Sequence, residues 1–154
     1  MSTEVKAIEW TYALSVGVKV IDDEHKFLLS ILNDLVRSLE ESNQKPIIMR
    51  AIEELVGFTN YHFGHEEELM ITFGYPDYEP HKRLHTNFVA KLLEFEKDVA
   101  GGARSLPGLA TFVHDFVLGH FMRTDQELGA FLKTRMPPGQ AFDFNHDATL
   151  GVLP

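Results

Sequence analysis

Residues 46–73 read PIIMRAIEELVGFTNYHFGHEEELMITF. Apolar side chains recur there at alternating spacings of four and three, which is the period of an α-helix with one buried face. In the second half of the stretch, a histidine and a glutamate occupy positions where that period calls for apolar residues. The stripe consists of Ile48, Ile52, Leu55, Thr59, His62, Glu66, Leu69 and Phe73. The pattern predicts a long helix with a polar interruption on its buried face.

Similar periods on either side predict three further helices, at about residues 20–39, 80–99 and 105–133. Short breaks rich in Asn, Gly and Pro separate the four segments. Because short connections favour antiparallel neighbours, we expect an all-α fold, an up-down-up-down four-helix bundle. The expected division is an ordered, non-helical N-terminal arm at 1–19, the bundle at 20–133 and a C-terminal tail at 134–154, which can fold back on the bundle.

Composition excludes several classes of function. The chain has 154 residues, with 14 Lys and Arg against 23 Asp and Glu, a net charge of −9 and no Cys. The acidic balance argues against nucleic acid as a partner. The missing Cys excludes disulfides, thiolate metal sites and iron–sulfur clusters. No apolar run is long enough to insert into a membrane, so we expect a cytoplasmic protein. We also expect a monomer.

Histidine is enriched, with eight residues in the chain. His62 and Glu66 stand four apart, as do His81 and His85, so each pair projects from one side of its predicted helix. His25 lies on the apolar side of the first predicted helix. These spacings favour side chains that converge on a common point.

His120 and Asp125 are spaced differently. They stand five apart, which is about 140° around an ideal α-helix. Either the helix is locally distorted between them, or the two side chains approach an extended target from different sides.

Together these residues predict a metal centre inside the bundle, because buried polar groups are costly unless they bind something in common. The candidate ligands are His25, His62, Glu66, His81, His85, His120 and Asp125. Five imidazoles, two bridging carboxylates and one bridging solvent oxygen would fill about eleven of the twelve positions of two octahedral ions. One position would remain for a small diatomic ligand. This count favours iron and fits tetrahedral zinc poorly.

The chain resembles the hemerythrin family in its bacterial single-domain form. The resemblance covers about residues 8–132 and rests on a run of motifs in a fixed order. These are Ile21-Asp22-Asp23-Glu24-His25-Lys26, His62-Phe63-Gly64-His65-Glu66-Glu67, His81-Lys82-Arg83-Leu84-His85 and His120 with Asp125. An N-terminal arm with Trp10 and Ser15-Val16-Gly17-Val18 also looks like that of the family.

The resemblance implies reversible O2 binding by a carrier, store or delivery protein. The implied cofactor is a pair of non-haem Fe2+/Fe3+ ions with a bridging oxo or hydroxo group, and O2 is the ligand. The implied roles are Glu66 and Asp125 as bridges, His81, His85 and His120 on the coordinatively full iron, and His25 and His62 on the iron with the open position. His65, His114 and His146 match no ligand position and are expected at the surface or behind the ligands.

Two other functions stay open. The chain could sense oxygen or redox state through a signalling partner, or it could be a di-iron peroxidase or oxygen-activating enzyme. Di-iron enzymes in such bundles use Glu-x-x-His pairs and about four Glu, whereas this chain offers one Glu and one Asp, so we expect no enzyme. A carrier would deliver O2 to an oxygen-consuming enzyme.

Some residues depart from the family pattern. Glu24 stands where the family often has Gln, and Phe116 and Val117 stand where relatives often carry Trp and Leu. Phe116 and Val117 are predicted to form apolar walls around the ligand, together with Phe63 and Phe121. We expect the smaller Val117 to speed ligand release or autoxidation, which Val117→Leu would test.

Overall fold

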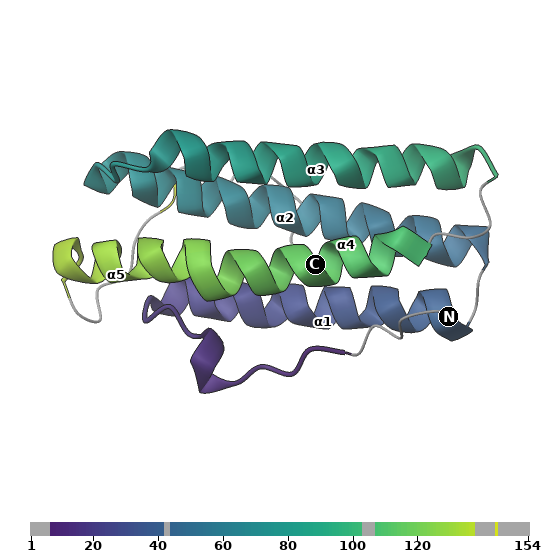
Figure 1. Ribbon diagram of the computed structural model, residues 1–154, viewed down its shortest axis with the longest axis horizontal. Coiled ribbons are helices and arrows are strands. Elements are labelled where there is room, and N and C mark those ends of the chain that lie inside the picture. Colours follow the sequence, from purple (N-terminus) through teal and green to yellow (C-terminus); the bar gives the residue numbers. More distant parts are fainter. Residues whose placement is uncertain (1–6, 42–43, 103–106, 138–143, 145–154) are drawn as a thin grey trace.

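The structure is a computed structural model, and it describes residues 7–41, 44–102, 107–137 and 144. The helices are α1 (Lys19–Glu41), α2 (Lys45–Phe73), α3 (Tyr78–Ala100), α4 (Pro107–Gly119) and α5 (Asp125–Arg135). A π-helical turn, η2 (His120–Thr124), joins α4 to α5, so these three elements form one continuous rod (Figure 1). Over the described ranges no strand is present, and no helix is both long and apolar enough to cross a membrane.

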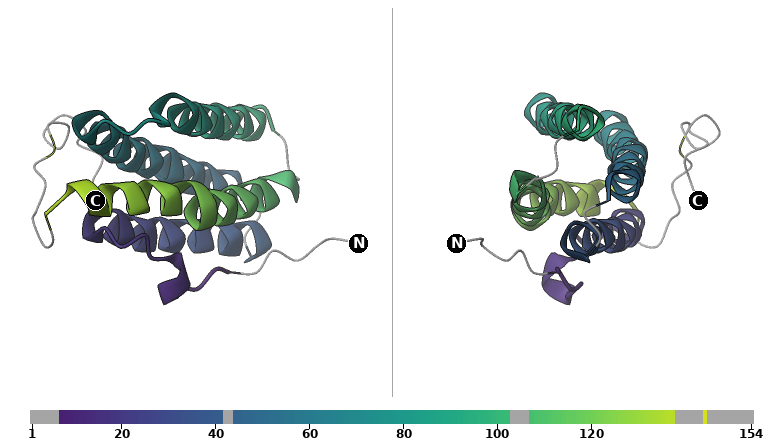
Figure 2. Two further views of the ribbon diagram at one scale, coloured as in Figure 1. Left: turned by 60° about the vertical axis from the view of Figure 1, so that its left-hand side comes forward. Right: turned by 90° about the vertical axis from the view of Figure 1, so that its right-hand side faces the viewer.

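Four antiparallel rods pack side by side, and consecutive rods are neighbours around the bundle (Figure 2). Helix α2 packs against both α1 and α3, and the rod made of α4, η2 and α5 closes the bundle against α1. Each observed helix end lies within two residues of its predicted position. The predicted all-α up-down-up-down bundle is confirmed.

The N-terminal arm contains a short helical turn that the sequence did not predict. Residues Tyr12–Leu14 form a 3-10 turn, η1, in which the Leu14 N–H donates to the Thr11 carbonyl. The turn directs Leu14 into the core, where its exposure is 4%. Because the turn buries a single residue, it leaves no repeating apolar spacing in the sequence from which a helix could be predicted.

Hydrogen bonds join the arm to the first helix of the bundle, α1, and to the last, α5. Asp22, in the first turn of α1, accepts hydrogen bonds from the Ser15 hydroxyl at 2.6 Å and from the Val16 N–H at 2.8 Å. On the other side, the Gln126 side chain donates to the Ser15 carbonyl at 2.8 Å. A Cβ added at Gly129 would lie 2.3 Å from the Val16 carbonyl oxygen, so the arm crosses α5 in contact with its backbone.

Two apolar clusters fill the interior. The larger includes Leu28, Leu55, Leu92 and Val113, and the smaller includes Ile21, Leu69, Leu128 and Leu132. Along α1, His25 falls between Ile21 of the smaller cluster and Leu28 of the larger one. Along α2, Glu66 lies about one turn before Leu69, which belongs to the smaller cluster. The polar interruption predicted from the sequence is therefore a layer between two apolar clusters.

Only one residue of the tail beyond Pro137 is among those described. Phe144 packs against the smaller cluster, and its ring stacks on the His65 ring with 3.9 Å between centroids. At this residue the tail returns to the bundle.

Candidate metal centre

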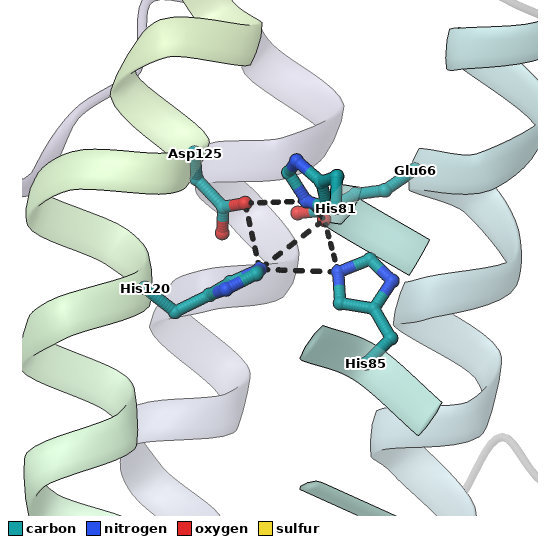
Figure 3. Close-up of side chains that lie close together, drawn as sticks. All are labelled: Glu66, His81, His85, His120 and Asp125. Carbon is teal, nitrogen blue, oxygen red and sulfur yellow. Dashed lines mark hydrogen bonds and ion pairs between the residues drawn. The ribbon is translucent and has the colours of Figure 1, made fainter. Parts of the chain in front are cut away.

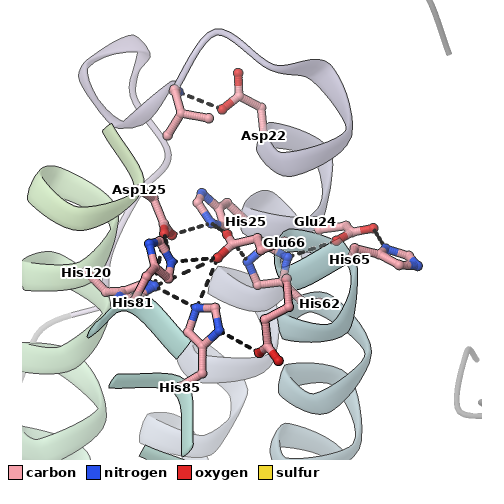
Figure 4. A network of polar contacts seen from close by, with 12 residues as sticks. Asp22, Glu24, His25, His62, His65, Glu66, His81, His85, His120 and Asp125 are labelled. Carbon is pink, nitrogen blue, oxygen red and sulfur yellow. Dashed lines mark hydrogen bonds and ion pairs between the residues drawn. The ribbon is translucent and has the colours of Figure 1, made fainter. Parts of the chain in front are cut away.

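Seven buried side chains meet in the polar layer between the two apolar clusters (Figure 4). Each is at most 4% exposed, and every rod contributes at least one. They are His25 from α1, His62 and Glu66 from α2, His81 and His85 from α3, His120 from η2 and Asp125 from α5. The structure thus brings together all seven candidate ligands that the spacing singled out.

Their donor atoms form two overlapping sets. The first donor set consists of Glu66, His81, His85, His120 and Asp125 (Figure 3), and the second of His25, His62, Glu66 and Asp125. Within each set, one donor atom from each residue lies within 4.8 Å of all the others. Only the two carboxylates belong to both sets, so each set is a possible site for one metal ion.

Each carboxylate presents one oxygen to each donor set. The four nearest contacts are His85 Nε2 to Glu66 Oε1 at 3.1 Å, His62 Nε2 to Glu66 Oε2 at 2.8 Å, His120 Nε2 to Asp125 Oδ1 at 2.9 Å and His25 Nε2 to Asp125 Oδ2 at 3.0 Å. A carboxylate that turns its two oxygens toward two sites has the arrangement of a bridging ligand.

The π-helical turn explains the five-residue spacing of His120 and Asp125. The Asp125 N–H donates to the His120 carbonyl, an i to i+5 bond in place of the usual i to i+4 bond. The wider turn brings Asp125 over His120, so that both side chains point into the bundle (Figure 3). Of the two explanations left open by the sequence, local distortion is the one observed. Single π turns of this kind often occur at functional sites.

The donor atoms fit a bound cation better than they fit one another. Within the described part of the chain, neither oxygen of Asp125 has a donor with hydrogen-bond geometry, nor does Glu66 Oε2. The Nε2 atoms of His85 and His120 face each other at 3.0 Å. At most one of these nitrogens can donate to the other, whereas both can donate a lone pair to a metal ion. Imidazole and carboxylate donors are compatible with iron, among other transition metals.

Without a cation, the carboxylates raise the pKa of two of the imidazoles, His62 and His81. Burial lowers the pKa of His62, but the charge of Glu66 and the hydrogen bond to Glu24 outweigh burial and raise the pKa to about 10. Burial also lowers the pKa of His81, and contacts with Asp125 and Glu66 raise it to about 9. A metal ion that binds these nitrogens must therefore displace protons.

Two further carboxylates stand behind the histidines. Glu24 accepts a hydrogen bond from His62 Nδ1 at 2.8 Å through one oxygen, and from His65 Nδ1 at 2.5 Å through the other. Glu67 accepts one from His85 Nδ1 at 2.9 Å. Burial raises the pKa of Glu24, but the two histidine contacts outweigh it and leave the pKa below its ordinary value. Such contacts fix the tautomer and ring orientation of a ligating histidine.

The supporting roles of Glu24 and Glu67 are not predicted by the sequence pattern. In the sequence Glu24 stands out only as a departure from the family pattern beside His25, whereas in the structure it contacts His62 and His65 of α2. A usable signal existed, because Glu24 and Glu67 each directly adjoin a candidate ligand in the sequence.

The three remaining histidines have different surroundings. His65 is buried behind His62, where it contacts Glu24, and it is not at the surface. His114 is partly exposed and lies 3.4 Å from Asp115. His146 lies outside the described residues.

Aromatic rings stack on two histidines of the first donor set, His85 and His120. The Phe63 ring stacks parallel to that of His85 with 3.8 Å between centroids. The Phe116 ring stacks on that of His120 at 4.8 Å. These contacts agree with the predicted apolar walls, whereas the Phe121 side chain lies outside what the structure describes.

A four-helix bundle with histidine and carboxylate donors at its centre defines a class of metal-binding helical proteins, and comparison with known proteins specifies the family. The family model "Hemerythrin HHE cation binding domain" matches residues 16–132. The bacteriohemerythrin of Stenotrophomonas maltophilia is 31% identical over 127 residues, which is 82% of each chain. That of Methylococcus capsulatus is 29% identical and covers 80% of this chain and 95% of its own. The chain belongs to the hemerythrin family.

A solved structure supports the same conclusion. The crystal structure of wild-type hemerythrin matches this fold with a TM-score of 0.76 at 27% identity. The match covers 82% of this chain and 98% of that one. The family implies non-haem iron, and the donor sets described above could hold a metal ion.

Proposed function

We propose that this chain binds O2 reversibly at a non-haem di-iron centre and acts as an oxygen carrier, store or delivery protein. Membership of the hemerythrin family supports the proposal. The observation that carries it is the pair of shared carboxylates, because Glu66 and Asp125 each turn one oxygen to each donor set.

In this proposal the two donor sets hold one iron ion each. Glu66 and Asp125 would serve both ions, and the three histidines of the first donor set would complete the ligands of one of them: His81, His85 and His120. Among the described residues, the second donor set adds His25 and His62 to the two carboxylates, one donor fewer than the first, so its ion would be the one with room for O2. Bound iron would supply that open position and the electrons that reversible O2 binding requires.

The chain's own residues contribute orientation and exclusion of water. Glu24 and Glu67 hold His62 and His85 through their Nδ1 atoms, which leaves the Nε2 atoms directed into the centre. Val117, one turn before the π turn, is 1% exposed and helps to exclude water. A dry, apolar surrounding protects a bound ligand from protonation by solvent.

The buried hydroxyl of Thr59 does not offer a proton to this layer. Thr59, one turn before His62, donates its hydroxyl to the Leu55 carbonyl of its own helix at 2.8 Å. The donor sets contain two carboxylates among seven residues. Oxygen-activating bundles use about four Glu, so this donor composition favours carriage over oxidation.

Repeated oxygenation tests the proposal. The iron-loaded chain is reduced without air, exposed to air and reduced again, while iron content and the visible spectrum are recorded. We expect about two irons per chain and a coloured form that appears and disappears over several cycles. Rapid turnover of a peroxide-dependent substrate with no stable coloured form would instead indicate an enzyme. A delivery role would further require an oxygen-consuming enzyme as partner, and a sensory role a signalling partner.

A further inference from the structure

A groove of about 390 Å³ runs between α2 and α3 on the outside of the bundle. Its floor reaches the buried residues Phe63 and His85, and its rim includes the exposed side chains of Asn60, Thr86 and Leu93. Ligand sites for small molecules commonly have volumes of about 300–1,000 Å³. The groove is therefore large enough for a molecule of the size of a substituted benzene ring.

Gly64 keeps this groove open. It lies within helix α2, and a Cβ added there would meet no atom within 4 Å. A glycine inside a helix costs about 0.5–1 kcal/mol relative to alanine. Neither a positive φ nor a close approach of another segment requires glycine at this position. The space beside it is thus retained although a side chain would fit and would favour the helix.

One carboxyl side chain lines the groove. Of the described residues that line it, only Glu67 is an acid or a base besides the histidine on the floor. The Glu67 side chain is 22% exposed and accepts the hydrogen bond from His85 Nδ1. The apolar surface comes from Phe63, Val89 and Leu93. A carboxylate beside apolar walls selects a ligand with an apolar body and a positive group.

We propose that the α2–α3 groove is a binding site for a small organic cation, whose apolar body lies against Phe63, Val89 and Leu93 and whose ammonium group meets Glu67. The ammonium competes with His85 for the Glu67 carboxylate. This consequence rests on the proposed function, in which His85 is an iron ligand: binding in the groove then alters the iron centre through one hydrogen bond.

Calorimetric titration of the full chain, as isolated, tests the site itself. The probes are 2-phenylethylammonium, 2-phenylethanol and phenylacetate, which share a ring and differ in charge. We expect saturable binding of the cation, with the neutral and anionic probes weaker by about tenfold or more, because a hydrogen bond to a charged group is lost. The site is disproved if phenylacetate binds as well as the cation, or if no probe gives saturable heat.

A matched pair of variants separates the groove from general attraction to an acidic protein. Gly64→Leu fills the groove, whereas Gly119→Leu places the same side chain at the last residue of α4, another glycine with helical backbone where an added Cβ meets no atom within 4 Å. We expect about tenfold weaker binding of the cation in Gly64→Leu and unchanged binding in Gly119→Leu. Both should keep or raise the melting temperature, because leucine favours a helix over glycine. Equal affinity in the two variants would overturn the assignment.

The coupling to the metal centre has a separate readout. In the iron-loaded chain, the visible spectrum should shift with 2-phenylethylammonium along the same saturation curve as the heat, and the shift should be absent in Gly64→Leu. Saturable heat without a spectral shift would disprove the coupling through His85. Because the calorimetry needs neither iron nor O2, its outcome is independent of whether the chain carries oxygen.

Discussion

Asp125 presents one oxygen to each donor set, so its removal should affect both metal ions at once. We predict that Asp125→Ala lowers bound iron from about two to fewer than one per chain, measured by colorimetric iron analysis after desalting. Asp115→Ala is the control, because that carboxylate is exposed and lies away from the centre. A full iron complement and normal oxygenation in Asp125→Ala would refute its assignment as a bridge.

Glu24 supports a candidate ligand without belonging to either donor set. We predict that Glu24→Ala weakens iron binding by about 10–100-fold, because His62 loses the acceptor that orients it. Glu24→Gln should lose less, since its amide oxygen still accepts a hydrogen bond. The measurement is the rate at which a chelator removes iron, with Asp23→Ala as the control at the exposed neighbouring position. Iron loss at the same rate in Glu24→Ala and Asp23→Ala would contradict the supporting role.

For individual residues, the sequence predicted which side chains meet in the candidate metal centre. It did not predict the carboxylates that hydrogen-bond to those histidines. Spacing of four placed His62 with Glu66 and His81 with His85, because helical geometry alone relates such pairs. The contact of Glu24 with α2 depends on how two helices are rotated against each other, which local periodicity does not contain. The metal-ligand roles themselves remain predictions, to be decided by experiments on iron binding.

The contact between the arm and α5 requires a glycine. We predict that Gly129→Ala destabilises the protein by about 1–3 kcal/mol, because the added Cβ would overlap the Val16 carbonyl. Gly119→Ala should instead stabilise it by about 0.5–1 kcal/mol, since nothing lies near that Cβ. Urea unfolding of both variants gives the comparison. Equal stabilisation by the two substitutions would show that the arm does not press on α5.

Helix positions were predictable and helix distortion was not. Apolar periodicity and the Gly and Pro breaks placed the ends of the four rods within two residues. The sequence indicated only that something was unusual between His120 and Asp125, because a π turn and a spread-out target give the same five-residue spacing. The π turn depends on packing along the whole rod, in which α4 and α5 must both keep their apolar faces inward.

For the whole molecule, iron and folding should be coupled. Metal-free chains must bury the polar layer between the two apolar clusters without a cation to bind it. We predict that chelation lowers the melting temperature by about 10 °C, as expected for a ligand present at about a thousand times its dissociation constant. Calorimetry on iron-loaded and metal-free protein checks this, and equal melting temperatures would contradict it.

Reversible O2 binding is the central claim, and a balance of O2 tests it most directly. Reduced, iron-loaded protein is mixed with a known amount of O2 in a closed oxygen electrode, and the bound gas is then recovered under argon. We predict uptake of about one O2 per two irons and recovery of nearly all of it, repeated over several cycles. Steady consumption of O2 with little recovery would contradict the claim and identify the centre as oxygen-activating.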